Sequence, residues 1–127
     1  MNAETAARQV VVADDDLLFS SRVTGSLASL GYQAVVVRSA EALHAALRRD
    51  PRAAVVNLAA RRFDAAEAIR RAKADEATRG VPLLGFCGHR DGERMAAARA
   101  AGCDAVTTNG IIAADLGRAL GALLATA

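Results

Sequence analysis

Short apolar runs alternate along the chain with longer stretches in which apolar residues recur every three or four positions. The runs predict five β-strands, at residues 10–13, 33–37, 53–58, 81–86 and 104–107. They are rich in valine and leucine and apolar almost throughout, which is typical of central parallel strands covered on both faces. The stretches between and after them predict five helices.

Residues that favour helix ends bound these helices. The markers are Gly31 after the first helix, Ser39 and Pro51 around the second, Asp64 before the third, and Asp91 and Gly102 around the fourth. The fifth helix presents its apolar residues at helical spacing, at positions 112, 116, 119, 120 and 123. Alternating strands and helices predict an α/β fold with right-handed crossovers and helices on both faces of a parallel sheet. We expect a single domain over residues 1–127, with a flexible tail at residues 1–8.

Charge and composition narrow the classes of function. The net charge is only +2, with both signs spread along the chain, which argues against direct binding to nucleic acid or to a membrane. The sequence has no apolar run approaching the roughly 20 residues of a membrane-spanning helix and no signal-peptide pattern. We therefore expect a cytoplasmic protein, in which Cys87 and Cys103 are free thiols.

Polar residues follow two of the predicted strands where those strands end. The first strand runs into Asp14, Asp15 and Asp16, and the third ends at Asn57. The carboxyl ends of parallel strands meet at one edge of a sheet, where open α/β folds keep their sites. One strand end is therefore strongly anionic, while the other carries a neutral amide where an acid would complete an acidic pocket.

Four strings together carry a resemblance to a known family. They are VVVADDDLL at the first strand, LASLGYQAVVV from the first helix to the second strand, VPLLGF at the fourth strand and AAGCDAVTTNG around the fifth. The chain resembles, from about residue 8 to residue 124, the receiver domain of bacterial two-component response regulators. The resemblance implies a flavodoxin-like three-layer sandwich with sheet order 2-1-3-4-5, two helices on one face and three on the other.

Most functional positions of the receiver family are altered here. The acidic pair that holds magnesium in receivers matches Asp14 and Asp15, which are kept. The other positions are changed: the phosphoacceptor aspartate falls on Asn57, the hydroxyl residue on Cys87, the aromatic switch residue on Val106 and the lysine on Asn109. The usual prolines are also absent, with Arg61 after the third strand and Gly110 after the fifth.

Chemistry explains why these changes matter together. An amide cannot act as the carboxylate nucleophile that forms an acyl phosphate. Lys73, the only lysine, falls in the middle of the third helix and cannot replace the lysine lost at Asn109. The resemblance with these departures predicts a pseudo-receiver: a protein-interaction module of a bacterial two-component-type pathway, independent of phosphorylation and without enzymatic activity.

Alternative interpretations of the pocket remain open. A receiver-like switch could respond to a metal, a small ligand or oxidation of Cys87 instead of phosphoryl transfer. Asp14 and Asp15 are then the candidate metal ligands, although no cofactor is expected, because magnesium prefers several oxygen ligands and a third carboxylate is missing. Arg61 or Arg62 could also fold back and neutralise the acids. An enzyme of flavodoxin-like fold is disfavoured because no GxGxxG motif or phosphate loop is present.

Other reactive residues suggest no catalytic site. Cys87 and His89 are too few to form a metal or redox site, and Cys87 is interpreted as a packing residue. His44, the other histidine, falls in the second helix, away from the predicted site edge.

The resemblance places the partner surface on the fourth helix, the fifth strand and the fifth helix, a face that could also pair two copies. Gly117 and Gly121 lie four residues apart on the fifth helix, each costing roughly 1 kcal/mol relative to alanine. The two glycines indicate either neutral sequence drift in an Ala- and Gly-rich chain or the close approach of a partner helix. The candidate contact residues are Arg94, Arg99, Ile111, Gly117, Arg118 and Gly121, of which the arginines could equally be solvated surface charges.

Overall fold

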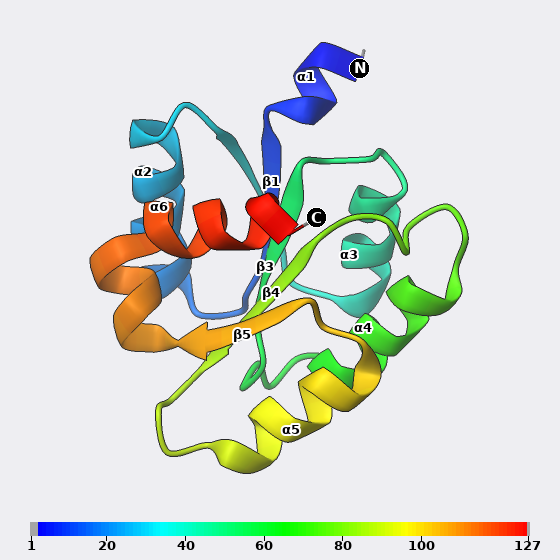
Figure 1. The fold of residues 1–127 in the computed structure, drawn as a ribbon, viewed down its shortest axis with the longest axis vertical. Coiled ribbons are helices and arrows are strands. Elements are labelled where there is room, and N and C mark those ends of the chain that lie inside the picture. The colour runs from blue at the N-terminus through cyan, green and yellow to red at the C-terminus, as the bar shows by residue number, and fades with distance from the viewer. Residues whose placement is uncertain (1–2, 127) are drawn as a thin grey trace.

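The computed structural model, which describes residues 3–126, contains one five-stranded parallel sheet of order β2-β1-β3-β4-β5 (Figure 1). Its strands are β1 (Gln9–Ala13), β2 (Gln33–Val37), β3 (Ala53–Asn57), β4 (Leu83–Cys87) and β5 (Ala105–Thr108). All five predicted strands are present, with bounds that differ by at most two residues from those predicted. The predicted sheet order and fold class are therefore confirmed.

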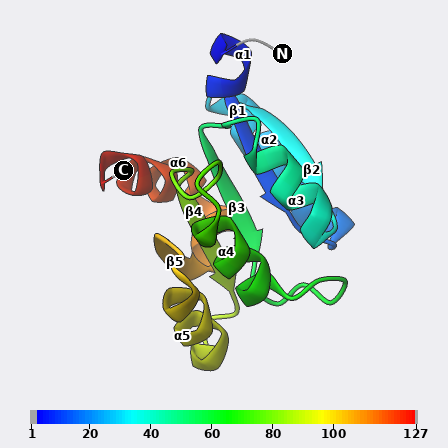
Figure 2. The ribbon, with the colours of Figure 1, turned by 90° about the vertical axis from the view of Figure 1, so that its right-hand side faces the viewer.

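Helices cover both faces of the sheet. They are α1 (Ala3–Ala7), α2 (Leu17–Ser29), α3 (Ala40–Leu47), α4 (Ala65–Ala74), α5 (Gly92–Ala101) and α6 (Asn109–Thr126). The helices α2 and α6 pack on one face, whereas α3, α4 and α5 follow one another along the other face (Figure 2). This is the predicted division into two and three helices. No helix within residues 3–126 has the length and apolar composition needed to cross a membrane.

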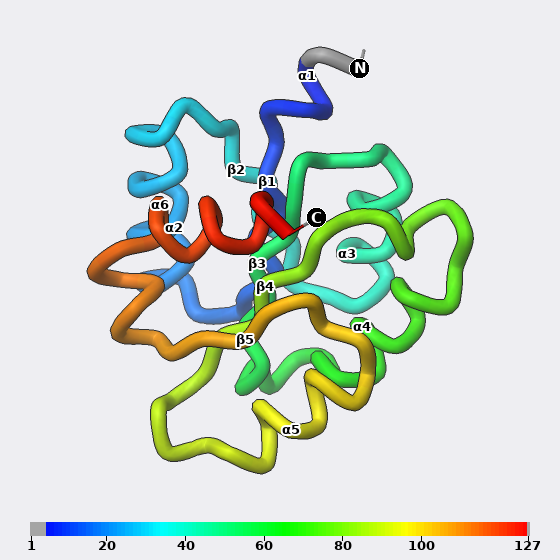
Figure 3. The backbone as a smooth tube through the Cα atoms, in the orientation of Figure 1, coloured from blue at the N-terminus to red at the C-terminus, as the bar shows by residue number. Residues whose placement is uncertain are grey.

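The additional helix, α1, precedes the first strand. It forms in the segment expected to be a flexible tail, and the backbone trace places it above the start of β1 (Figure 3). The Arg8 carbonyl accepts a hydrogen bond from the Gln33 amide, so the chain joins the sheet from that residue on. Residues 1 and 2 of the expected tail lie outside the described residues.

The core consists of two apolar layers, one on each side of the sheet. On β1, Val11 points to the layer that contains Leu43 and Ile69, while Val10 and Val12 point to the layer that contains Leu27. Successive side chains of a strand point to opposite faces, so a strand covered on both sides must be apolar throughout. This explains why the strands appear in the sequence as unbroken apolar runs.

Parallel register brings the strand ends together. Ala13 pairs with Val56 of β3, Asn57 pairs with Phe86 of β4, and Cys87 pairs with Thr108 of β5. The segments that follow β1, β3 and β5 therefore begin at the same edge of the sheet, as the strand pattern predicted.

The last helix is not continuous, contrary to the prediction. Asp115 has non-helical dihedral angles (φ −154°, ψ 58°), and its Oδ1 accepts a hydrogen bond from the Arg118 amide at 3.3 Å. Asp115 therefore acts as the N-cap of a second helical segment within α6. Its short polar side chain, placed just before Leu116, was the sequence signal for this break.

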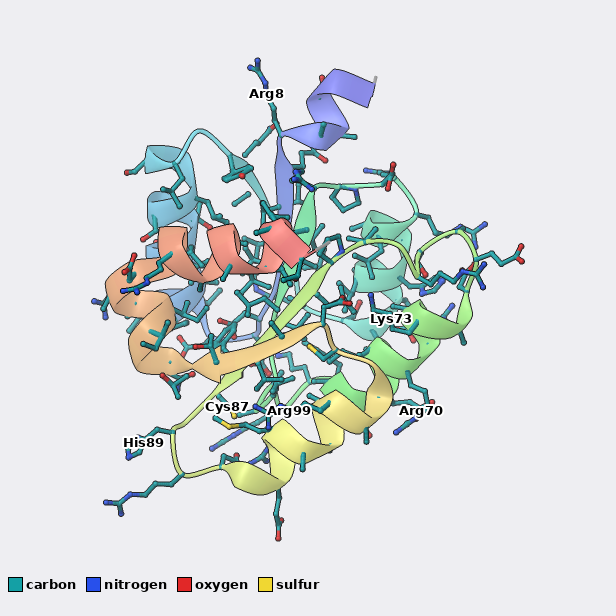
Figure 4. All side chains as sticks on the ribbon, in the orientation of Figure 1. Arg8, Arg70, Lys73, Cys87, His89 and Arg99 are labelled. Carbon is teal, nitrogen blue, oxygen red and sulfur yellow. The ribbon has the colours of Figure 1, made fainter. Side chains whose placement is uncertain are left out.

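Lys73 connects three segments at the edge opposite the strand ends described above. Its Nζ donates to the carbonyls of Arg79 and Val81 and to Asp104 Oδ2, the last at 2.7 Å. Asp104 Oδ2 also accepts from the Leu83 amide at the start of β4, at 2.8 Å. Figure 4 shows Lys73 on α4, well away from Cys87 and His89 near the end of β4. The only lysine is thus a structural residue, which sequence reasoning missed.

Replacing this lysine should therefore destabilise the fold. We expect Lys73→Met to lower the free energy of unfolding by about 1–3 kcal/mol, because carbonyls and a carboxylate lose a charged donor while the aliphatic stem is retained. Urea denaturation measures the effect. Arg71→Met is the matched control, since Arg71 is an exposed cation on the same helix with no side-chain partner among residues 3–126. Equal effects of the two substitutions would contradict the role assigned to Lys73.

Candidate functional site

The candidate site begins with Asp14, which directly follows β1 and is completely buried. Its Oδ1 accepts hydrogen bonds from Asn57 Nδ2 at 2.8 Å and from the Asp16 amide at 3.0 Å. Its Oδ2 is buried and has no hydrogen-bond partner in the described part of the chain. Burial raises the pKa of Asp14 above its ordinary value, although the hydrogen bonds from Asn57 and Asp16 act in the opposite direction.

Asn57 uses both ends of its amide. The Nδ2 group donates to Asp14, and Oδ1 accepts from the Ala59 backbone amide at 2.9 Å. An ionised carboxylate at this position could accept from Ala59 but could not donate to Asp14. The neutral amide is therefore matched to its two neighbours and joins the end of β1 to the loop between β3 and α4.

Asp15 binds the same β3–α4 loop, at residues further along the chain. Its Oδ2 accepts from the backbone amides of Arg61 and Arg62, at 2.7 and 2.9 Å. Burial acts to raise the pKa of Asp15, but the hydrogen bonds from the two amides outweigh it, so the pKa lies below its ordinary value. The guanidinium groups of both arginines form no ion pair within residues 3–126, so the anticipated ion pair is absent, although the charge of Arg62 contributes to the lowered pKa of Asp15. Sequence reasoning did not anticipate this backbone contact, and no local pattern signals it.

Asp16 has a local structural role. It is exposed, and its Oδ1 accepts from the Phe19 amide at 3.0 Å, so it is the N-cap of α2. Each residue of the acidic block thus has a different environment: Asp14 is buried, Asp15 holds the β3–α4 loop, and Asp16 begins a helix. The block is not a group of three equivalent, free carboxylates.

A cavity of about 520 Å³ lies above these residues. The side chains of Asp15, Asn57 and Asn109 line it, together with Asp16, Phe19, Ala59, Arg61, Arg62 and Phe86. The structure therefore brings together the strand ends that the sequence pattern placed at one edge. Asn109 is exposed at the mouth of the cavity, where it offers an amide and no positive charge.

Cys87 does not line this cavity. It is fully buried in the apolar layer beneath α3, α4 and α5, where its Sγ lies 3.8 Å from the Asp91 carbonyl. Burial raises the pKa of the Cys87 thiol, which disfavours the reactive thiolate. Val106 is half-buried and packs against the same layer. Both cysteines are free, and the interpretation of Cys87 as a packing residue is confirmed.

Asp14, Asp15 and Asn57 are the residues whose oxygens could coordinate magnesium at this edge of the sheet. Asp14 Oδ1 and Asp15 Oδ2 each accept two N–H groups, and Asn57 directs its N–H₂ group at Asp14. Octahedral coordination requires several oxygens with free lone pairs. Among the described residues no cluster of three or more His, Cys, Asp or Glu side chains could hold a metal ion. Asp14 Oδ2 has no hydrogen-bond partner, but no third such side chain completes a cluster with Asp14 and Asp15 among the described residues.

The predicted contact residues have different surroundings. Arg94 pairs with Asp91 and faces the β3–α4 loop, and Arg99 is exposed on α5. A Cβ at Gly117 would lie 3.0 Å from Leu30 Cδ2, so this glycine allows α6 to approach α2 of the same chain. At Gly117 the close approach is therefore made within the molecule, by Leu30. Gly121 has no such neighbour within 4 Å.

Ile111 and Arg118 belong to a groove between β5 and α6. This groove, of about 530 Å³, is mainly apolar, and its lining includes Leu84, Ala105, Val106, Ala119, Ala122 and Leu123. Asp104, Asp115 and Arg118 provide charged groups beside it. Ile111 is 47 % exposed, a large fraction for an apolar side chain. The name β5–α6 groove is used for this surface below.

Comparison with known proteins identifies the fold. No family model matches the sequence, and no curated protein resembles it at the sequence level. Solved structures match well: a protein of Chloroflexus aurantiacus described as a response regulator has a TM-score of 0.84 and 20% identity, covering 94% of this chain and 98% of its own. The receiver domain of a Pseudomonas aeruginosa sensor histidine kinase, with magnesium in its active-site cleft, has a TM-score of 0.83 and 20% identity, covering 94% and 99%.

A chemotaxis protein of the CheY type from Vibrio cholerae has a TM-score of 0.82 at 15% identity, covering 94% of this chain and all of its own. The structural neighbours are thus receiver domains, and the fold is that of a receiver. At these identities the likeness concerns the fold alone.

The amide at position 57 can be tested through the pH dependence of stability. We expect Asn57→Asp to lower the free energy of unfolding by about 1–3 kcal/mol near pH 7, because Asp14 loses a donor and gains a negative neighbour. The two adjacent carboxylates raise each other's pKa in the folded state, which then binds more protons than the unfolded state. The deficit relative to wild type should accordingly shrink as the pH falls to about 5.

Urea titrations at both pH values measure this change. Asn109→Asp is the control, since it adds the same charge to the same cavity without removing a hydrogen bond from Asp14. A deficit for Asn57→Asp that is independent of pH, or equal to that of Asn109→Asp, would contradict the role assigned to Asn57.

Proposed function

We propose that this protein is a pseudo-receiver: a protein-interaction module of a bacterial two-component-type pathway that acts in the cytoplasm without being phosphorylated. One observation carries the proposal. The amide of Asn57, at the position of the phosphoacceptor in receivers, donates to Asp14 and accepts from the Ala59 amide. This residue is both chemically unable to accept a phosphoryl group and structurally bound to its neighbours.

The remaining positions support the same interpretation. Cys87 is buried and is absent from the lining of the cavity, so it offers no hydroxyl to a phosphoryl group there. Asn109 lines the cavity but carries no charge to pair with a phosphorylated side chain. The only lysine, Lys73, is held by Asp104 on another part of the molecule. The carboxylate acceptor, the hydroxyl group and the positive charge would therefore each have to be supplied by a different residue.

We further propose that the site needs no cofactor and performs no catalysis. The Pseudomonas aeruginosa receiver coordinates magnesium in its cleft. In this chain, amide groups donate two hydrogen bonds each to Asp14 Oδ1 and Asp15 Oδ2. These bonds hold the β3–α4 loop against the end of β1, a role that a bound cation could also have. The loop therefore keeps its conformation without phosphorylation or metal binding.

Because the conformation of the β3–α4 loop is fixed, the signalling output of the protein depends on the surface that it presents to a partner. We propose that the β5–α6 groove receives a protein partner, or a second copy of this chain. The groove is mainly apolar and carries an exposed Ile111 at its side, with Arg118 and Asp115 as charged neighbours. Apolar centres with polar rims are the usual composition of protein interfaces. Of the predicted contact residues, Ile111 and Arg118 support this surface, whereas Gly117 does not.

Phosphorylation is tested directly. After incubation with acetyl phosphate and magnesium, wild-type protein should show no phosphoryl adduct by intact-mass spectrometry, because position 57 offers no carboxylate. The Asn57→Asp variant is measured alongside, with beryllofluoride and amide NMR as the readout. We expect no shift of β5 and α6 signals even in this variant, since Cys87, Val106 and Asn109 remain altered. Stoichiometric adduct formation by the wild type would overturn the proposal.

The interaction surface is tested by paired substitutions on α6. Ala122→Arg places a charge in the β5–α6 groove and should abolish capture of a specific partner from cell extract, or dissociate a homodimer in sedimentation. Ala125→Arg is the matched control, because Ala125 is also exposed on α6 but does not line the groove. Loss of association with both variants, or with neither, would argue against this surface.

A further inference from the structure

A second groove lies on another part of the molecule, between the β3–α4 loop, the start of α4 and α5. Its volume is about 630 Å³. Its floor is apolar and consists of Leu58, Phe63, Ala65, Ala66 and Ala97. Three arginines, Arg61, Arg62 and Arg94, also line it, against one carboxylate, Asp64. The name arginine groove is used for this surface, which is separate from the β5–α6 groove.

The acidic groups near this groove are already engaged. Asp64 Oδ1 accepts from the Glu67 amide at 3.1 Å as the N-cap of α4, and Asp91 pairs with Arg94. Asp15 binds the Arg61 and Arg62 backbone amides and leaves both guanidinium groups unpaired in the described part of the chain. Both side chains are exposed. Neither guanidinium group forms an ion pair in the described part of the chain, although the charge of Arg62 contributes to the lowered pKa of Asp15.

The two arginines project from a fixed backbone. Their amides are held by Asp15, and the loop that carries them is joined to Asp14 through Asn57. A ligand that binds their guanidinium groups does not have to order the loop first, which lowers the conformational cost of binding. The hydrogen bonds that close the receiver-type pocket thus also preorganise the arginine groove.

The lining distinguishes between classes of ligand. Nucleic acid is disfavoured because the only aromatic residue of the groove, Phe63, is 9% exposed and cannot stack on a base. A small free anion would contact the rim and leave the apolar floor unused. An extended peptide uses both: carboxylates form forked hydrogen bonds with guanidinium groups, and apolar side chains cover the floor.

We propose that the arginine groove binds an acidic peptide segment of a partner protein, with its carboxylates on Arg61 and Arg62 and its apolar side chains over Ala66 and Ala97. This surface is additional to the β5–α6 groove, and it does not require the phosphorylation-independent function proposed above. The charge complementarity is supplied by two exposed guanidinium groups that form no ion pair with any residue of the described chain.

Fluorescence anisotropy with a short labelled peptide of glutamate and leucine tests the proposal. We expect binding that weakens with salt, and about a tenfold loss of affinity for the double variant Arg61→Ala/Arg62→Ala, since rim charges are screened and moderate in effect. The backbone amides that bind Asp15 remain in this variant, so its urea midpoint should match wild type. The matched control, Arg49→Ala/Arg52→Ala, removes two exposed arginines at the opposite edge of the sheet and should bind like wild type.

A second peptide and a second variant test the apolar floor and the location of binding. A peptide of glutamate and serine should bind more weakly, because it cannot cover the apolar floor, and Ala122→Arg in the β5–α6 groove should have no effect. The proposal is overturned by absence of binding, by equal losses in both double variants, or by equal affinity for the glutamate–serine peptide. Competition by inorganic phosphate as effective as that of the unlabelled peptide would also overturn it, by identifying a simple anion site.

Discussion

The arrangement of the site depends on how the chain compensates one buried carboxylate. Asp14 is completely buried at the end of β1, and burying a charge without hydrogen bonds is costly. The Asn57 amide and the Asp16 amide both donate to its Oδ1. Because Asn57 also accepts from the Ala59 amide, the same side chain fixes the path of the β3–α4 loop. One amide thus connects the burial of a charge to the position of a loop.

The orientation of the loop has consequences for charge at the surface. Asp15 accepts its hydrogen bonds from backbone amides and forms no ion pair with an arginine side chain of the described residues. Arg61 and Arg62 are consequently free to face outward beside α5, at the arginine groove. A metal ion or a guanidinium group in contact with Asp15 would distribute these charges differently. The fixed position of the β3–α4 loop and the basic surface are therefore two results of the same set of hydrogen bonds.

Small residues set how closely the helices approach. The chain has few aromatic residues, and its layers are built mainly from Ala, Val, Leu and Ile. Gly117 allows Leu30 of α2 to contact α6, whereas Ala119 and Ala122 leave the β5–α6 groove open on the other side of the helix. The glycine and alanine content of α6 therefore serves packing within the molecule as well as a surface that could receive a partner.

The sequence by itself determined the strands, most helix ends and the collection of polar residues at one edge of the sheet. These features follow from local rules: apolar runs, helical spacing, capping residues such as Ser39 and Asp64, and the alignment of parallel strand ends. It also indicated that Asn57 cannot be a phosphoacceptor, which is a matter of side-chain chemistry alone.

Only the tertiary structure decided which groups the polar residues contact. The sequence did not reveal that Asp15 binds loop amides, that Lys73 is held by Asp104, or that Gly117 lies against Leu30. These three contacts join residues distant in sequence, and they depend on the path of a loop or the direction of a side chain. No periodic pattern encodes these, because they are set by how the packed elements meet.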